Sequence, residues 1–291
     1  MSTFDETGGR GPAGPEVNHW RRFLLWWLGT SVIGTLLVVL VLAPGMPPGN
    51  GTVESSGQVF DNTVLLGVST PVAAAVIVFV VYAVIAFRER DAGSVLEGPR
   101  VLGDARIQTW WLVVTTGLVL FLAAFGTIEL EGNGAGGGQG PSPLSKPGAG
   151  THVLQVQVIA QQWKFDYRWP AYGGVETPTL YLPAHTTIEF HVTSLDVIHS
   201  FWAYQLGVKA DANPGVDNVA YVTTKAPMTF EVHCAELCGV WHGYMYNSGA
   251  VVPQARFATW IAHEQKVYAP ITKSLPRYAL QYAPQPTRRG G

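Results

Sequence analysis

Three long apolar runs dominate the first half of the chain: Phe23–Leu42, Val64–Phe87 and Ile107–Ile128. None of them contains Asp, Glu, Lys or Arg. Because an α-helix rises about 1.5 Å per residue, each run is long enough to cross a hydrocarbon core of about 30 Å. Uncharged runs of this length are rare in soluble cores, so the pattern predicts two or three transmembrane helices.

The first run has two interpretations. Arg21 and Arg22 precede it and the sequence Val41-Leu42-Ala43 closes it, which is also the layout of a cleavable secretion signal. Pro44 directly after that point disfavours cleavage, and the apolar core is long for a signal. A retained helix over 23–42 is therefore favoured, with a cleaved signal segment as the alternative.

The basic residues around the runs predict the orientation. Arg21 and Arg22 precede the first run, the 43–63 connection has no Lys or Arg, and four arginines stand between the second and third runs (Arg88, Arg90, Arg100, Arg106). Because Lys and Arg gather on the cytoplasmic side, we expect the N-terminus and the 88–106 loop inside a bacterial-type plasma membrane. Everything after Ile128 is then expected on the outer side.

The pattern changes after residue 150 and predicts β-structure. Trp163, Phe165, Tyr167 and Trp169 alternate with polar residues, as do the positions of 188–193, which places one face of a strand in a core and the other in water. Further short strands are expected over 152–160, 219–223, 228–233 and 249–252, and a closing helix over 254–266. Short strands between Pro/Gly turns are typical of a sandwich or Greek-key barrel.

Composition sets the remaining boundaries. Residues 1–22 are expected as a disordered N-terminal tail, 131–150 as a Gly/Pro linker, 151–267 as the β-domain and 268–291 as a C-terminal tail. Only 13% of the residues are charged and the net charge is −2, which gives no indication of nucleic-acid binding.

The candidate chemistry lies in one loop. Cys234, Cys238, His242 and Met245 fall within twelve positions, and His199 stands upstream at the end of a loop. A disulfide is the usual state of two cysteines in an exported domain, but it leaves the spacing of the histidines and Met245 unexplained. Zinc leaves Met245 without a role, and a mononuclear blue-copper site has one cysteine fewer. Two thiolates, two imidazoles and a thioether suit two copper ions bridged by sulfur.

At these residues the sequence resembles cytochrome c oxidase subunit II, from about Val64 to Lys266. The resemblance rests on a Cys-x-Glu-x-Cys-x-x-x-His-x-x-Met run beginning at Cys234, on Asp196 with His199, on Gln162-Trp163, on 206–211 and on Pro214-Gly215. It implies a membrane-anchored, cupredoxin-like Greek-key β-sandwich that carries a CuA centre. The implied activity is electron transfer from cytochrome c to haem in subunit I, where oxygen reduction is coupled to proton translocation.

The resemblance also implies roles for single residues. Cys234 and Cys238 are expected to bridge both coppers, with His199 and Met245 completing one and His242 and the Glu236 carbonyl completing the other. The Glu236 side chain is expected to help hold a magnesium ion at the interface with subunit I. Trp163 is the expected point of electron entry, with a core tryptophan as the alternative, and Asp196 is expected to orient the His199 loop. Subunits I and III, cytochrome c and the lipid membrane are the implied partners.

Two features depart from the family. Gln108 stands where related chains often have a glutamate that opens a proton pathway, and Gln does not titrate. From residue 151 onward the chain has nine acidic residues and ten Lys or Arg residues, and Arg168 stands where related chains often have an acid. We therefore expect docking of the electron donor to depend weakly on ionic strength.

Three competing functions are weighed against this one. A quinol oxidase subunit II lacks the copper ligands, whereas all are present here. A nitrous oxide reductase-type copper domain follows a large propeller, whereas membrane helices precede this one. A membrane-tethered cupredoxin-type copper protein outside any oxidase stays as the alternative. The chain has no Cys-x-x-Cys-His, so no c-type haem is expected.

Overall fold

The structure is a computed structural model that describes residues 18–88, 103–133, 137–138 and 147–272. Most of the expected N-terminal tail, Gly/Pro linker and C-terminal tail lies outside the described residues. The same holds for most of the loop expected over 88–106. The chain divides into two compact units, one built on 1–42 with 64–99 and the other on 43–63 with 100–291.

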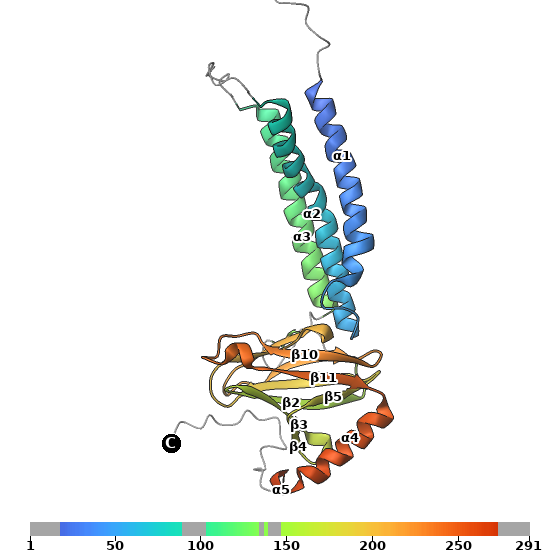
Figure 1. Cartoon of the computed structure of the whole chain (residues 1–291), viewed down its shortest axis with the longest axis vertical. Coiled ribbons are helices and arrows are strands. Elements are labelled where there is room, and N and C mark those ends of the chain that lie inside the picture. The colour runs from blue at the N-terminus through green and yellow to red at the C-terminus, as the bar shows by residue number, and fades with distance from the viewer. Residues whose placement is uncertain (1–17, 89–102, 134–136, 139–146, 273–291) are drawn as a thin grey trace, which may run out of the picture. The chain divides into compact units, whose positions relative to one another are not determined.

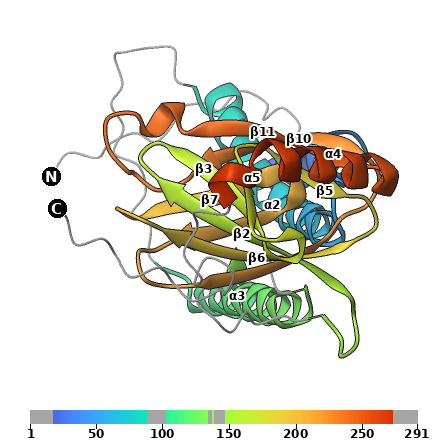
Figure 2. The same ribbon diagram turned by 90° about the horizontal axis from the view of Figure 1, so that it is seen from below.

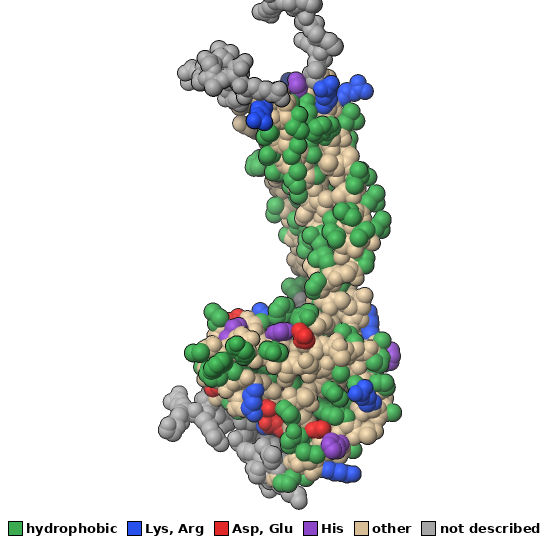
Figure 3. Space-filling view, viewed as in Figure 1, with side chains coloured by type: hydrophobic (Ala, Val, Ile, Leu, Met, Phe, Trp, Pro, Cys, Tyr) green, Lys and Arg blue, Asp and Glu red, His purple; other side chains and the backbone are tan. Residues whose placement is uncertain are grey.

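Three described helices are long and apolar enough to cross a membrane. Helix α1 (His19–Leu37) continues through a π-helical turn (Val38–Leu42) into a 3-10 turn (Ala43–Gly45), and is followed by α2 (Val53–Ala86) and α3 (Ala105–Asn133). Their side chains are mostly hydrophobic and outward-facing, as the space-filling view displays (Figure 3). The helices therefore present apolar surfaces suited to contact with lipid, rather than packing into a buried core.

Within the first unit, α1 packs against the later part of α2. The indole N–H of Trp27 donates to the carbonyl of Pro71 at 2.8 Å. At the N-terminal end of α1, the His19 ring lies 2.8 Å from the hydroxyl of Tyr82, which is near the C-terminal end of α2. These bonds give polar groups on apolar helices a partner, which a hydrocarbon environment requires.

The second unit contains a β-sandwich of two mixed sheets (Figures 1 and 2). The first sheet has the order β1 (Gly137–Gly138), β8 (Val208–Ala212), β7 (His199–Ala203), β10 (Met228–Cys234), β11 (Tyr246–Val252), β5 (Leu180–Pro183). The second has the order β4 (Val175–Thr177), β3 (Lys164–Trp169), β2 (Val153–Gln161), β6 (Thr187–Ser194), β9 (Asn218–Thr223). This architecture confirms the expected sandwich.

The core lies between the sheets. Phe201 on the first sheet contacts Phe165, Tyr167 and Phe190 of the second, with ring centroids 5.2 to 6.4 Å apart. Helix α4 (Gln254–Val267) closes one side with two buried residues, as the helical spacing predicts, and leads to the short α5 (Ala269–Thr272). Large interlocking aromatics of this kind provide a rigid scaffold for loops at the sheet ends.

The outer face of the second sheet corrects one expectation. Alternation predicts that the polar residues of β3 face water, but Asp166 and Arg168 are buried. The register sets Gln157, Arg168 and Glu176 side by side on three strands. The Arg168 guanidinium donates to Glu176 at 2.9 Å and to Gln157 at 3.0 Å. Lateral pairing across the strands therefore satisfies this charge and keeps it out of contact with solvent.

The start of α2 belongs to the sandwich unit. Thr52 and Ser55 exchange capping hydrogen bonds at 2.9 Å, and the Thr52 hydroxyl donates to the carbonyl of Leu206 at 2.7 Å. The side-chain amide of Gln58 donates to the backbone carbonyl of Gly207 at 2.7 Å. At Gly207 (φ +67°) a Cβ atom would lie 2.8 Å from the Ser55 backbone. Only glycine allows this close approach, so residues 49–58 are structurally part of the β-domain.

Candidate metal centre

The hairpin of β10 and β11 positions most of the predicted metal ligands. Pairing runs from Met228↔Val251 to His233↔Tyr246, and the loop between them contains the 3-10 turn η6 (His242–Tyr244). At its mouth the amide of Cys234 donates to the carbonyl of Met245 at 3.0 Å. The register thus closes the loop on itself and brings its two ends together.

Strand β7 brings in the distant histidine. Cys234 pairs with Phe201, and the amide of Ala235 donates to the carbonyl of Ser200 at 3.0 Å. This register places His199, at the first position of β7, beside the end of β10. The Ser200 hydroxyl donates to Asp211 on β8 at 2.8 Å, which ties the strand to its other neighbour.

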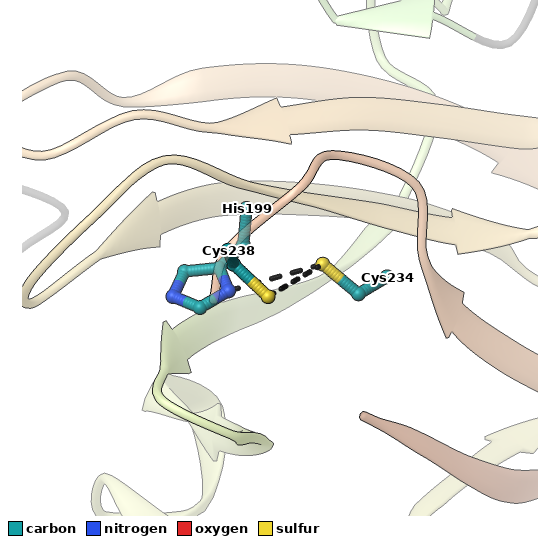
Figure 4. A group of neighbouring side chains, drawn as sticks. All are labelled: His199, Cys234 and Cys238. Carbon is teal, nitrogen blue, oxygen red and sulfur yellow. Dashed lines mark hydrogen bonds between the residues drawn. The ribbon is translucent and has the colours of Figure 1, made fainter. Parts of the chain in front are cut away.

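The two cysteine sulfurs form the centre of the group (Figure 4). The Sγ atoms of Cys234 and Cys238 lie 3.7 Å apart, and both cysteines are free. A disulfide bond is about 2.05 Å long, so the thiols are adjacent without being joined. The Nδ1 atom of His199 lies 3.8 Å from the Cys234 sulfur.

The other predicted ligands surround the same two sulfurs. The Cys238 sulfur lies 3.5 Å from His242 Nδ1 and 3.8 Å from Met245 Sδ. The Cys234 sulfur lies 3.3 Å from the carbonyl oxygen of Glu236. The structure therefore brings together every residue that the sequence predicts as a copper ligand, from two strands and the one loop between β10 and β11.

The site is largely shielded from water. Cys234, Cys238, Met245 and His199 are buried, whereas His242 is half-buried. Hydrogen bonds and charges act more strongly in such a low-dielectric environment than in water.

Asp196 holds the ring of His199. The Nε2 atom of His199 lies 2.9 Å from a carboxylate oxygen of Asp196. The same carboxyl group accepts the amides of Gln162 and Val197, each at 2.7 Å. The Asp196 carboxylate thus favours the tautomer protonated at Nε2 and directs the Nδ1 lone pair toward the sulfurs.

Trp163 contacts the backbone of the site through its side chain. It lies in the turn between β2 and β3, half-buried against the core, and its indole N–H donates to the Cys238 carbonyl at 3.2 Å. The side-chain amide of Gln162 donates to the same oxygen at 2.9 Å. The ring packs against the core and its N–H contacts the loop of the predicted ligands, and electron entry at Trp163 stays a prediction.

The two thiols differ in acidity. Burial acts to raise the pKa of Cys234, but hydrogen bonds with His199 and with the Glu236 and Ser200 backbones lower it to about 6. Burial and the neighbouring Cys234 raise the pKa of Cys238 to about 12. Burial acts to lower the pKa of His199, but Cys234 and Asp196 raise it. The pair therefore favours a thiolate at Cys234 and a thiol at Cys238, and a metal held by both sulfurs would displace the proton of Cys238.

The donor set fits copper. His199, Cys234 and Cys238 offer ligand atoms that all lie within 4.8 Å of one another. Two thiol sulfurs, two imidazole nitrogens, a thioether and a carbonyl exceed the four ligands of a structural zinc site and include the soft donors that copper prefers.

Residues 175–252 match the family described as cytochrome c oxidase subunit II, periplasmic domain. Curated proteins named cytochrome c oxidase subunit 2 are similar over longer stretches. That of Bacillus subtilis is 28% identical over 89% of this chain, and that of Thermostichus vulcanus is 36% identical over 42% of it. The chain is thus similar to proteins of the cytochrome c oxidase subunit II family. It spans 72% of the length of the Bacillus protein and 37% of the Thermostichus protein.

A solved structure of such a domain is also similar. The crystal structure of the periplasmic domain of cytochrome oxidase subunit II from Bradyrhizobium japonicum is 29% identical, with a TM-score of 0.38. The match covers 40% of this chain and 95% of that chain. The two packed sheets and the matched family agree with the expected cupredoxin-like β-sandwich.

Some residues around the site were missed by the sequence interpretation. The Gln162 amide on Cys238, the Ser200–Asp211 bond and the packing of Thr52 and Ser55 had no role assigned. The spacing Thr52-x-x-Ser55 before an apolar run was a readable signal of a helix start. The other contacts depend on register between distant strands, which local sequence does not reveal.

Proposed function

We propose that this subunit II holds a two-copper CuA centre that accepts electrons from cytochrome c and passes them to haem in subunit I. The observation that carries the proposal is the convergence of four donor groups on two unjoined sulfurs 3.7 Å apart. When bound, two coppers that share one unpaired electron supply one-electron chemistry with little change in bond lengths.

Each ligand has a proposed part. Cys234 and Cys238 would hold both ions through their sulfurs. His199, 3.8 Å from Cys234, and Met245, 3.8 Å from Cys238, complete one position. His242, 3.5 Å from Cys238, and the Glu236 carbonyl, 3.3 Å from Cys234, complete the other. The rigid sandwich keeps these groups in place, so little reorganisation accompanies electron transfer.

Trp163 is the proposed point of electron entry. Its ring is half-buried, and its N–H contacts the backbone carbonyl of the proposed ligand Cys238 at 3.2 Å. An electron arriving at this ring is therefore one hydrogen bond from a bridging ligand. Asp196 acts only as a positioning residue, because it touches His199 and not the sulfurs.

The copper loop offers an apolar docking surface. Leu237 and Val240 are 88% and 86% exposed, and Tyr244 at the end of η6 is 71% exposed. Exposed apolar side chains clustered on one loop are typical of an interaction site. We infer that cytochrome c docks here by apolar contact, since few charges surround the loop.

The proposed orientation follows the basic residues. Arg21, Arg22 and the arginines of 88–106 lie inside, and the copper domain lies outside the plasma membrane. The helix over 23–42 is proposed to be retained. The exposed Glu236 side chain is proposed to hold magnesium together with subunit I, and subunit III completes the complex. Gln108, exposed in the first turn of α3, leaves proton entry at that position to a group other than itself.

Copper stoichiometry and EPR spectroscopy test the centre. The full chain, purified in detergent and reduced, is loaded with copper, and excess metal is removed. We expect two coppers per chain and an EPR signal in which the electron couples equally to both. One copper per chain, or coupling to a single nucleus, overturns the proposal.

Assembly tests the wider role. Purification of the chain from its native membrane through an affinity tag is expected to recover a haem-containing partner in equal amount. Recovery of the copper-loaded chain without haem favours a tethered copper protein instead.

A further inference from the structure

Aromatic rings cover the outer side of the sheet directly behind the metal centre. The register pairs His233 on β10 with Trp202 on β7 and with Tyr246 on β11. The rings of His233 and Tyr246 are stacked at 5.9 Å, and Tyr204 lies 6.0 Å from His233 and 5.7 Å from Trp202. We call Trp202, Tyr204, His233 and Tyr246 the outer rung. Because strand side chains alternate, the outer rung points away from Cys234 and Phe201.

A cavity opens beside the outer rung. Its volume is about 540 Å³, within the range of about 300–1,000 Å³ that small-molecule sites occupy. Trp202, Tyr204 and His233 form one wall, and Pro47, Pro48 and Gln58 form the other. Both walls belong to the same structural unit. Cys234 is also among the lining residues, although its side chain points to the opposite face of β10, so a molecule bound there lies beside the strand that carries a predicted copper ligand.

The walls select a flat, uncharged ring. Trp202, Tyr204 and the proline rings offer apolar faces, and no described residue that lines the cavity is Asp, Glu, Lys or Arg. The indole N–H of Trp202 and the hydroxyl of Tyr204 make no hydrogen bond with the described residues. Aromatic faces with a few polar groups at their edges are what a planar aromatic ligand with polar substituents requires.

We propose that this cavity binds a planar, uncharged aromatic diol or diamine and that this molecule is an electron donor to the metal centre. The donor role rests on the proposed function, whereas the binding itself does not. The bound molecule loses one electron and becomes its radical, and the copper pair held by Cys234 is reduced by that one electron. A diol also releases one proton to solvent, whereas a tetra-alkylated diamine releases none.

Binding is tested on the metal-free full chain. Tetramethyl-p-phenylenediamine, a planar diamine that is oxidised reversibly by one electron, is dialysed to equilibrium against the reduced protein without oxygen. We expect one saturable site, weakened about tenfold or more in Trp202→Leu, because the largest stacking surface is lost. Tyr204→Leu is the second variant, should the first fold poorly. Tyr181→Leu, at the far edge of the same sheet, is expected to bind as the unchanged chain does.

Two results overturn the site. Binding that does not saturate, or that is equal in Trp202→Leu and the unchanged chain, contradicts a built cavity. Displacement of the diamine by an aliphatic alcohol of similar size identifies a lipid-tail site instead.

The donor role is tested on the copper-loaded chain by rapid mixing with the same diamine. The rate of copper reduction is expected to saturate with concentration and to fall about tenfold in Trp202→Leu, with an unchanged EPR spectrum. If both Trp202→Leu and the unchanged chain show a normal copper pair that the diamine reduces equally fast, the donor role is overturned and the proposed function stands. Saturable binding without a copper pair overturns the proposed function and the donor role, and leaves the site standing.

Discussion

The two faces of strand β10 meet opposite demands. Phe230, Val232 and Cys234 point inward and are buried, whereas Glu231 and His233 point outward and are partly exposed. The inner face ends in a sulfur that contacts three donor groups. The outer face ends in an imidazole stacked on Tyr204 and Tyr246. One strand therefore supplies both the metal centre and the wall of the neighbouring cavity.

This difference between the inward and outward faces of β10 indicates where substitutions are tolerated. An inward residue is fixed by packing density and by ligand geometry together, since neither a void nor a displaced donor is compensated. Substitution of an outward residue removes mainly contacts that water can replace. Variants on the two faces of the same strand should therefore differ sharply in their effect on the metal centre.

The largest effect is expected for Cys238→Ser. A serine oxygen is a hard, poorly acidic donor and does not replace a thiolate that bridges two coppers. The two-copper EPR signal should disappear, and copper content should fall to one ion per chain or fewer. Retention of an unaltered signal contradicts the bridging role of Cys238.

A matched pair on β7 tests packing. Phe201→Ala removes a fully buried ring that contacts three aromatic rings of the opposite sheet. It should lower the free energy of unfolding of the β-domain by about 3–5 kcal/mol. Trp202→Ala, one residue away and 42% exposed, should lower it by about 1 kcal/mol or less. Denaturant unfolding followed by near-UV circular dichroism measures both, and equal losses would break the comparison.

Asp196→Asn should weaken copper binding without abolishing it. The carboxylate accepts three N–H groups, from His199, Gln162 and Val197. An amide has only one oxygen, so its NH₂ group faces at least one of these donors. Copper affinity, measured by competition with a chelator, should fall about 10–100-fold. Asp217→Asn changes another carboxylate bound to a histidine, His191, and serves as the control with unchanged affinity.

Salt should affect the donor reaction weakly. The domain from residue 151 carries nine acids and ten Lys/Arg, and Arg168 is buried in a pair with Glu176. Screening acts mainly on exposed charges, of which the copper loop has few. The rate of copper reduction by cytochrome c should change only a few-fold between low and physiological salt. A steep decline would place a charged docking surface elsewhere on the domain.

The smallest effect is expected for His233→Ala. The residue adjoins Cys234 in sequence but points to the outer face, where it lies 3.2 Å from Glu231. The copper EPR and absorption spectra should stay as they are. A changed spectrum would mean that the two faces of β10 are coupled.

Much of the site was predictable from the chain alone. The spacing from Cys234 to Met245 lies within one hairpin loop, so local sequence already implies proximity. The long apolar runs and the alternation around Phe165 and Tyr167 likewise predicted helices and strands. The alternation was a poor guide at Asp166 and Arg168, because lateral pairs between strands bury charge on the face expected to meet water.

By itself the sequence determined the membrane helices, the β-domain and the kind of metal the ligands select, since these depend on residue type and spacing. Only the tertiary structure decided that His199 meets Cys234, that Gln162 and Trp163 reach the Cys238 carbonyl, and that the start of α2 packs into the sandwich. It also decided which side of β10 faces the metal. These facts depend on the register between strands far apart in the chain, where a shift of one residue turns every side chain to the other face.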